Sequence, residues 1–200
     1  MIAIIDYGMG NLRSVQKALE SFGAATKITQ SKDDILKAQK IILPGVGAFA
    51  VAIEKLQSLD LINPLKKAIK SNKPFLGICL GLQLLFTESQ EAKRVKGLDI
   101  FKGTVKKFKS LKVPHIGWNQ ININPEKDSK IFDGISEQSN MYFCHSYYVE
   151  PQDKNIIAAT TDYGLEFVSA VSKGSIFGVQ FHPEKSQAIG LRVLENFTNL

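Results

Sequence analysis

Apolar runs alternate with amphipathic segments along the first half of the chain. Short apolar runs at 2–5, 41–43 and 75–78 predict buried strands. Between them, apolar residues recur at helical spacing and predict helices at 12–22, 32–37, from after the turn 44–49 to about 59, and at 61–71. Asn11 is expected to cap the first helix, and Gly23 to end it. This alternation predicts a mostly parallel sheet with helices on both faces.

The second half of the chain has a different pattern. Its apolar runs are short and separated by turn signals such as Asn124-Pro125 and Lys173-Gly174. These runs predict strands at 100–108, 113–118, 120–123, 141–149, 156–161, 167–172 and 175–181. A last helix is predicted at 189–197. We therefore expect one α/β domain over residues 1–200, with an antiparallel or mixed region in its second half.

The composition adds little beyond the class of an ordinary globular protein. Hydrophobic residues make up 44% and charged residues 22% of the 200 residues. The net charge of +6 is scattered, with one denser run at Lys102, Lys106, Lys107, Lys109 and Lys112. This run lacks interleaved aromatic residues and a nucleic-acid motif, so nucleic acid is not expected as a partner. It is interpreted as a solvated face or a contact for an acidic protein.

Targeting signals and cysteine usage predict a cytoplasmic protein. The N-terminal run lacks the basic region and cleavage site of a signal peptide. No apolar run approaches the roughly 20 residues that a membrane span needs, so no membrane partner is expected. The two cysteines, Cys79 and Cys144, are predicted to be free thiols in a reducing compartment.

Cys79 falls at the joint between the predicted strand 75–78 and an apolar helical run at 80–86. Gly77 and Gly81 flank it and allow the neighbouring backbone to come close at a tight turn. This is the nucleophile-elbow pattern with sulfur in place of oxygen, which is expected to expose the cysteine. The helix start favours the thiolate form. A buried structural cysteine is the alternative, and the paired glycines argue against it.

A histidine and a carboxylate stand two residues apart, at His182 and Glu184. On an extended segment, residues i and i+2 project to the same side, and Pro183 stiffens the link. Glu184 is therefore expected to hold one imidazole nitrogen while the other faces a nucleophile. Together with the Cys79 elbow, this spacing predicts a nucleophile–base–acid triad.

Other patterns carry less weight. The turn at Gly8-x-Gly10 lacks the third glycine of a dinucleotide fingerprint, because Arg13 occupies that position. No metal site is predicted, because none of the three histidines pairs with another at ligand spacing. Cys144 and His145 are adjacent on a predicted strand and point to opposite faces, so Cys144 is expected to pack as a small hydrophobic residue.

Six segments resemble, in order, those of the triad-type (class I) glutamine amidotransferases. They are Ile5-Asp6-Tyr7-Gly8-Met9-Gly10-Asn11, Pro44-Gly45-Val46-Gly47-Ala48-Phe49, Gly77-Ile78-Cys79-Leu80-Gly81-Leu82-Gln83, Pro114-His115-Ile116-Gly117-Trp118-Asn119, His145-Ser146-Tyr147-Tyr148 and 178–186. The second and fourth segments are most similar to the branch that serves histidine biosynthesis, the glutaminase subunits of imidazole glycerol phosphate synthase. The resemblance implies the family's fold, with a flavodoxin-like core.

The resemblance also implies roles for individual residues. Cys79 would be the nucleophile, His182 the general base and Glu184 the orienting carboxylate. The oxyanion would be held by the N–H of Leu80 and by a second N–H from the loop 45–47. The residues implied to bind substrate are Gly45, Val46, Gly47, Leu80, Gln83, Glu91, Ser146 and Tyr147.

The implied reaction is hydrolysis of glutamine to glutamate and ammonia through a cysteine thioester, with no cofactor. The implied partner is a cyclase of the (β/α)8-barrel type, which forms a heterodimer and uses the ammonia to make imidazole glycerol phosphate and AICAR. Trp118, Asn119 and Lys185 would lie at that interface, although the residues alone leave Trp118 either there or in the core. Cys144 departs from the branched apolar residue expected at its position.

Three alternatives remain open from the sequence. The chain could be the glutaminase subunit of another amidotransferase, although the loop at 44–47 argues against that. It could be a cysteine peptidase or stress protein of similar fold. It could also be a non-enzymatic binding module, for which Cys79 would have no measurable role.

Overall fold

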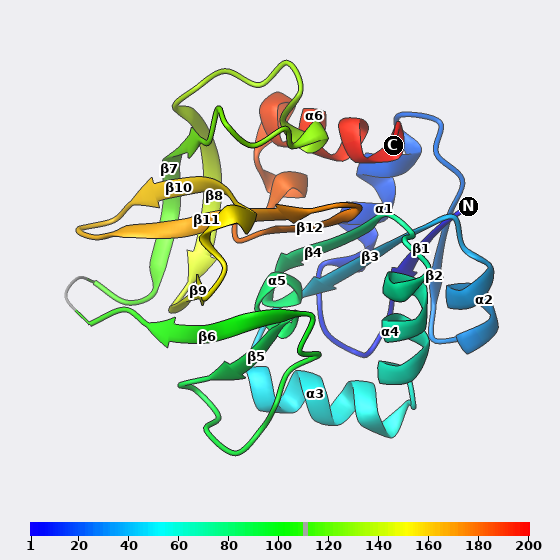
Figure 1. Cartoon of the computed structure of the whole chain (residues 1–200). Helices are drawn as coiled ribbons and strands as arrows, with labels where there is room; N and C mark the ends of the chain where they lie inside the picture. The colour runs from blue at the N-terminus through cyan, green and yellow to red at the C-terminus, as the bar shows by residue number, and fades with distance from the viewer. Residues whose placement is uncertain (110–111) are drawn as a thin grey trace.

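A computed structural model describes residues 1–109 and 112–200. Figure 1 shows strands of one large mixed sheet crossing the molecule, with helices packed around its N-terminal half. The main path of the sheet runs β2-β1-β3-β4-β12-β11-β10-β7-β8, and β5, β6 and β9 branch from it. Within the described residues, no helix combines the length and apolar character needed to cross a membrane.

The N-terminal half is parallel and helix-covered, as its alternating pattern predicts. Its strands β1 (Ile2–Ile5), β2 (Thr26–Thr29), β3 (Lys40–Gly45) and β4 (Phe75–Cys79) run in one direction. The helices between them are α1 (Leu12–Glu20), α2 (Lys32–Lys37), α3 (Phe49–Ser58) and α4 (Ile62–Lys70).

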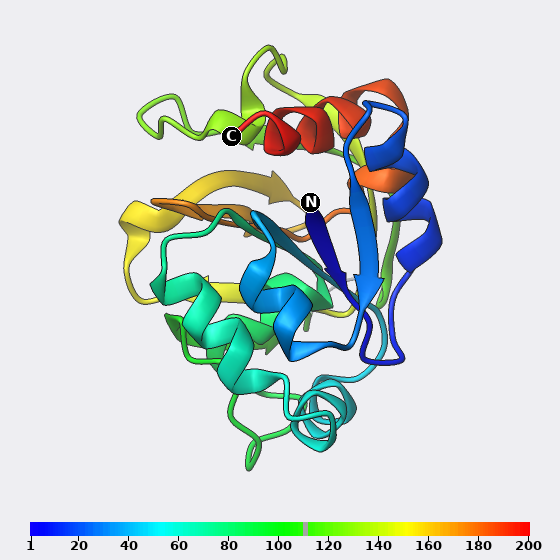
Figure 2. The same ribbon diagram turned by 90° about the vertical axis from the view of Figure 1, so that its right-hand side faces the viewer.

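Strand alternation divides the core into two layers. Ala3 and Ile5 of β1 pack with buried residues of α2, α3 and α4, whereas Ile2 and Ile4 pack with α1 and α6 (Gln187–Thr198). Figure 2 shows these two groups of helices on opposite sides of the sheet. Helices on both faces are thus confirmed.

The C-terminal half is largely antiparallel. Its strands are β5 (Phe86–Ser89), β6 (Phe101–Lys107), β7 (His115–Ile123), β8 (Ser139–His145), β9 (Tyr147–Pro151), β10 (Ile157–Asp162), β11 (Glu166–Lys173) and β12 (Ile176–Val179). Short 3-10 turns occur at η1 (Lys130–Phe132), η2 (Lys154–Ile156) and η3 (Pro183–Lys185). β12 pairs antiparallel with β11 and parallel with β4, which joins the two halves.

The helix after Cys79 is shorter than predicted. α5 covers only Leu80–Leu84, and Phe86 already belongs to β5. The carbonyls of Leu84 and Leu85 accept hydrogen bonds from the N–H groups of Leu98 and Ile100, respectively. These bonds to a distant segment replace the next turn of helix, and a local pattern cannot anticipate them.

Three other predictions about elements were wrong. The predicted strand 141–149 is two strands separated at Ser146, and the predicted runs 113–118 and 120–123 form the single strand β7. The side chain of Asn11 makes no capping hydrogen bond to α1. Residues 110–111 of the segment around the lysine run lie outside the described residues.

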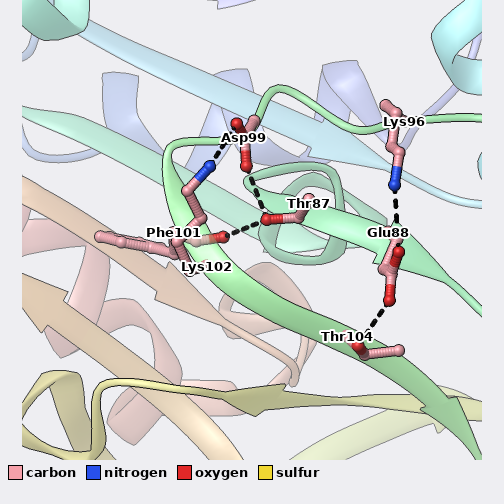
Figure 3. Close-up of polar contacts among 7 residues, drawn as sticks. All are labelled: Thr87, Glu88, Lys96, Asp99, Phe101, Lys102 and Thr104. Carbon is pink, nitrogen blue, oxygen red and sulfur yellow. Dashed lines mark hydrogen bonds and ion pairs between the residues drawn. The ribbon is translucent and has the colours of Figure 1, made fainter.

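Polar contacts hold the connection between β5 and β6, which carries Glu91 (Figure 3). The hydroxyl of Thr87 donates to Asp99 over 2.6 Å, and Lys102 lies 2.7 Å from the same carboxylate. Glu88 accepts from Lys96 at 3.1 Å and from Thr104 at 3.2 Å. Exposed ion pairs of this kind contribute little to stability, so their main effect is to fix the path of the chain.

The register around β4 brings distant segments to one edge of the sheet. Gly45 at the end of β3 lies beside Cys79 at the end of β4, and Val179 at the end of β12 lies beside Ile78. The carboxyl ends of three neighbouring parallel strands therefore meet there, which is where ligand sites form in such sheets.

Candidate active site

Cys79 stands on a strained turn between β4 and α5. Its backbone has φ 54° and ψ −108°, a conformation that residues with a side chain rarely adopt. A Cβ on Gly81 would lie 1.8 Å from the carbonyl oxygen of Leu43, and one on Gly77 would lie 2.6 Å from the carbonyl oxygen of Gly81. The turn therefore requires glycine on both sides of the cysteine, as the elbow pattern predicts.

The expected exposure of Cys79 was wrong, because only 5% of its surface is accessible. The residue nevertheless lines a cavity of about 290 Å³, which His182 also lines. The predicted site residues that share this cavity are Val46, Gly47, Leu80, Gln83, Glu91, Ser146, Tyr147 and Lys185. The sulfur is therefore within reach of a small molecule without lying on the outer surface.

His182 and Glu184 are paired as the spacing predicts. The Nδ1 of His182 lies 3.0 Å from Oε1 of Glu184, and both side chains are buried. Ser186 fixes this turn, because its hydroxyl donates to the carbonyl of His182 over 2.6 Å and accepts from the N–H of Tyr142.

The charge state of His182 is set by its two neighbours. Burial by itself lowers the pKa of His182, but hydrogen bonds to Cys79 and Glu184 and their negative charges raise it to about 10. At neutral pH the arrangement therefore favours an imidazolium between a sulfur and a carboxylate. Such a group can deliver a proton to a leaving group.

The loop after β3 approaches Cys79 from the neighbouring strand. A Cβ on Gly45 would lie 2.3 Å from the hydroxyl of Tyr7, so only glycine fits there. Gly47 has φ +94°, the left-handed region that favours glycine. Val46 and Gly47 line the cavity, whereas Gly45 lies behind it against Tyr7.

The predicted substrate-binding residues have well-defined internal contacts. Glu91 accepts a hydrogen bond of 2.8 Å from the N–H of Phe49 at the start of α3. The amide nitrogen of Gln83 donates to the carbonyl of Tyr147 over 3.1 Å and to Oε1 of Gln180 over 3.0 Å. Burial and the charge of Glu91 raise the pKa of the Tyr147 hydroxyl.

Two residues beside Cys79 were not predicted from the sequence. Gln180 is fully buried, and its amide nitrogen lies 3.6 Å from the Cys79 sulfur. Its spacing was a usable signal, because Gln180 precedes His182 by two residues on an extended segment. Tyr7 is also buried, and burial and the charge of Cys79 raise the pKa of its hydroxyl. Among the described residues, that hydroxyl has no hydrogen-bond partner.

The other two histidines form a pair that spacing along the chain does not reveal. His115 and His145 are opposite each other in the β7–β8 register, and their ring nitrogens lie 3.0 Å apart. Burial lowers the pKa of His115 to about 4. Burial is also the largest of the effects that lower the pKa of His145 to about 3. Within residues 1–109 and 112–200, no group of three or more potential ligands gathers as a metal site would.

The expectation that Cys144 packs as a small hydrophobic residue was wrong, because Cys144 is exposed. It does point away from the buried His145, but the face of the β7–β8 pair to which it points is open to solvent. The alternation of side chains along a strand predicts that adjacent residues point to opposite faces, but it does not predict which face is covered by the rest of the protein.

Trp118 lies on that same open face and is 48% exposed, so it is not a core residue. Its ring contacts Tyr142 edge-on at 6.0 Å, and Lys185 lies over the Tyr142 ring at 5.8 Å. Asn119 instead points inward, where its side-chain amide donates to the carbonyl of Asp162 over 2.8 Å. Of the three predicted interface residues, two are therefore available on this face.

Comparisons with known sequences identify a family and relatives of the chain. Residues 3–199 match the family model described as "Glutamine amidotransferase class-I". A protein from Pyrococcus furiosus is 52% identical, covering 100% of this chain and 98% of its own length. One from Methanocaldococcus jannaschii is 50% identical, and one from Syntrophotalea carbinolica 48%, each with both chains fully covered. All three are named "Imidazole glycerol phosphate synthase subunit HisH".

Solved structures show the same fold at much lower identity. A structure titled "Crystal structure of glutamine amidotransferase" has a TM-score of 0.78 at 15% identity, with both chains fully covered. Another, titled "Structure of PurLQS from Thermotoga maritima", has a TM-score of 0.72 at 22% identity, covering 99% of this chain and 97% of that one. These likenesses confirm the predicted fold class.

Proposed function

The chain belongs to the class-I glutamine amidotransferase family, and we propose that it is the glutaminase subunit of an imidazole glycerol phosphate synthase. In this role it hydrolyses glutamine to glutamate and ammonia. Relatives of that name at about 50% identity over the full chain support the assignment. The single observation that carries the chemistry is that Cys79 and the His182–Glu184 pair meet at one small cavity.

In the proposed reaction, the thiolate of Cys79 attacks the side-chain amide carbon of glutamine. His182 then gives its proton to the departing nitrogen, so that ammonia leaves and a thioester remains. Neutral His182 next takes a proton from water, which hydrolyses the thioester and releases glutamate. Glu184 holds the imidazole in one orientation throughout, which its 3.0 Å contact supports.

The oxyanion of each tetrahedral intermediate requires two donors. We assign them to the N–H of Leu80 and to one N–H of the loop 45–47. The position of Leu80 and Val46 at the cavity beside Cys79 supports this. Removal of one such donor typically costs about 3 kcal/mol of transition-state stabilisation, so a rotated peptide in this loop would nearly silence the site. Gln83, Glu91, Ser146 and Tyr147 are assigned to the amino-acid end of glutamine.

The proposed partner is a cyclase subunit of the (β/α)8-barrel type, which receives the ammonia in a heterodimer and makes imidazole glycerol phosphate and AICAR. The open face of β7–β8 supports such a contact, because Ile116 is 59% and Trp118 48% exposed. Lys185 lies between this face and the cavity. We also assign the pair to the cytoplasm, which the free thiols of Cys79 and Cys144 support.

The experiment is an ammonia-release assay with glutamine, on the chain alone and with the cyclase and its nucleotide ligand. We expect weak turnover alone and an increase of orders of magnitude in the complex. Trp118→Ala should weaken the complex, whereas Leu36→Ala, an exposed apolar residue on α2, should not. Peptide cleavage without glutamine hydrolysis would instead indicate a cysteine peptidase. Full glutaminase activity without the cyclase would contradict the expected activation by the partner.

A further inference from the structure

A continuous chain of hydrogen bonds runs through the interior from β7 to the sulfur of Cys79. The carbonyl of Tyr147 lies at its centre and accepts from two sides. Gln83 donates to it over 3.1 Å, and Nδ1 of His145 lies 2.8 Å from it. A carbonyl oxygen can only accept, so both neighbours must present an N–H to it.

This requirement fixes the orientation of Gln180. Because the NH₂ group of Gln83 faces Tyr147, its second hydrogen points to Oε1 of Gln180, 3.0 Å away. The NH₂ group of Gln180 is then the end that faces Cys79, with its nitrogen 3.6 Å from the sulfur. Reversal of the Gln180 amide would place a carbonyl oxygen against the sulfur, which would repel a thiolate.

The same logic fixes the histidines on the other side of Tyr147. His145 carries its proton on Nδ1, so its Nε2 accepts from Nδ1 of His115, 3.0 Å away. Nε2 of His115 in turn accepts from the amide of Asn119 at 3.4 Å. Both rings are neutral, because burial lowers their pKa values to about 4 and 3. The orientation of Asn119 is itself fixed by its bond to the carbonyl of Asp162.

We propose that Gln180 is a catalytic residue that donates a hydrogen bond to the Cys79 sulfur, and that Gln83, His145 and His115 are positioning residues that keep its NH₂ group turned that way. All four side chains are buried, so each depends on partners within the protein for its hydrogen bonds. The catalytic consequence rests on the proposed function. The chemical basis, which is the reactivity of the sulfur, can be measured without glutamine.

A hydrogen bond donated to the sulfur stabilises its charged form, and a tenfold change in that protonation equilibrium moves its midpoint by one pH unit. Loss of the Gln180 donor should therefore shift the pH midpoint at which Cys79 becomes nucleophilic upward by about one unit. The other titratable groups that face Cys79 are His182, with Glu184 behind it, and Tyr7. All three are kept unchanged in the test.

The test measures the rate of Cys79 alkylation by iodoacetamide as a function of pH. A Cys144→Ala background leaves Cys79 as the only thiol. Gln180→Met removes the donor at similar volume, and Gln180→Glu places a carboxylate oxygen against the sulfur. His115→Phe keeps an aromatic ring between Phe143 and Tyr163 but cannot donate to His145. Gln120→Ala, an exposed neighbour of Asn119 on β7, is the matched control.

We expect the midpoint to rise by about one unit in Gln180→Met, by more in Gln180→Glu, and by less in His115→Phe. The control should keep the parent midpoint. Thermal unfolding identifies folded variants, and His115→Phe is the second route if both Gln180 variants fail to fold. A parent midpoint in every folded variant would overturn the proposal. A shifted midpoint in a chain that never hydrolyses glutamine would instead refute the proposed function and leave this inference standing.

Discussion

Two buried imidazole environments border the same cavity, and their pKa values move in opposite directions. His182 lies between Cys79 and Glu184, and its pKa is raised to about 10. His115 and His145 lie against each other and aromatic rings, and their pKa values fall to about 4 and 3. Burial acts in the same sense on all three rings, so the difference comes from the partners.

The comparison shows that one fold can hold buried histidines in two opposite charge states. The His182 region combines charged groups, so its imidazole can carry a proton to a reacting atom. In the part of the chain that the structure describes, the hydrogen-bond partners of His115 and His145 are each other, the Asn119 amide and the Tyr147 carbonyl, so the two rings act as fixed donors and acceptors. The residue type alone therefore does not reveal whether a histidine carries charge in this protein.

The largest expected effect comes from removing the sulfur on the charged side. Cys79→Ser should reduce ammonia release from glutamine by at least roughly 10,000-fold, because a serine hydroxyl is a far weaker nucleophile at neutral pH. The measurement is glutamine turnover in the complex with the proposed cyclase partner. Cys144→Ser keeps the Cys79–His182 pair and should lose far less. A near-native rate in Cys79→Ser would remove Cys79 from the reaction.

A smaller effect is expected when the carboxylate is neutralised. Glu184→Gln removes the negative charge beside His182 and permits the wrong tautomer, so turnover should fall by about 100- to 10,000-fold. The pKa of His182 should also decrease, which NMR titration of its ring protons can follow. Glu54→Gln, an exposed carboxylate on α3, is the control. An unchanged pKa of His182 would show that Cys79 alone sets its charge.

The neutral pair predicts sensitivity to acid. In the unfolded chain a histidine has a pKa of about 6.5, so below that pH it binds a proton that the buried histidines of the folded chain do not bind. The free energy of unfolding therefore decreases as the pH falls. Each such histidine should cost up to about 2 kcal/mol between pH 7 and pH 5. For His182 the sign is opposite, because its stabilisation is complete below pH 6.5 and is lost as pH rises through about 10.

His115→Phe tests this acid sensitivity. Urea unfolding at pH 7, 6 and 5 should show that the variant loses about 2 kcal/mol less than the native chain over this interval. Carboxylates contribute equally to both proteins, so the difference between the two curves isolates the histidine. Parallel curves would mean that His115 is already able to take up a proton in the folded state.

The smallest effect concerns Tyr7, which borders the charged region without a hydrogen-bond partner among the described residues. Tyr7→Phe removes a buried hydroxyl that has no bond to lose, so the unfolding free energy should rise by about 1 kcal/mol. Thermal or urea unfolding measures this change. A Thr160→Val variant, which removes a hydroxyl bonded to Glu166, should not gain stability. Destabilisation by Tyr7→Phe would show that the hydroxyl does have a partner.

The sequence predicted the parallel half well because its signals are local. Each buried run and amphipathic helix there is complete within a few residues, and α2 has the predicted bounds, 32–37. The pairing of His182 with Glu184 was likewise predictable from spacing on one short segment. The catalytic roles of these residues stay predictions.

The missed features depend on contacts between distant segments. α5 ends early because the carbonyls of Leu84 and Leu85 bond to residues near 100, and the His115–His145 pair requires the β7–β8 register. The exposure of Cys144 depends on which face of that pair is covered. Spacing within one segment carries none of this information.

The parallel pairing of β4 with β12 has a consequence for how the chain tolerates change. The register of these two strands sets the distance between the sulfur of Cys79 and the imidazole of His182, because Cys79 ends β4 and His182 lies shortly after the end of β12. Longer surface loops in the segment between β4 and β12 would add only a modest entropic cost of loop closure and would leave the pairing of the two strands unchanged. A slip of one residue would move the imidazole by about 3.3 Å and turn it to the opposite face. The reactivity of the site should therefore survive many loop insertions, but a one-residue shift in the register of β4 and β12 should abolish it.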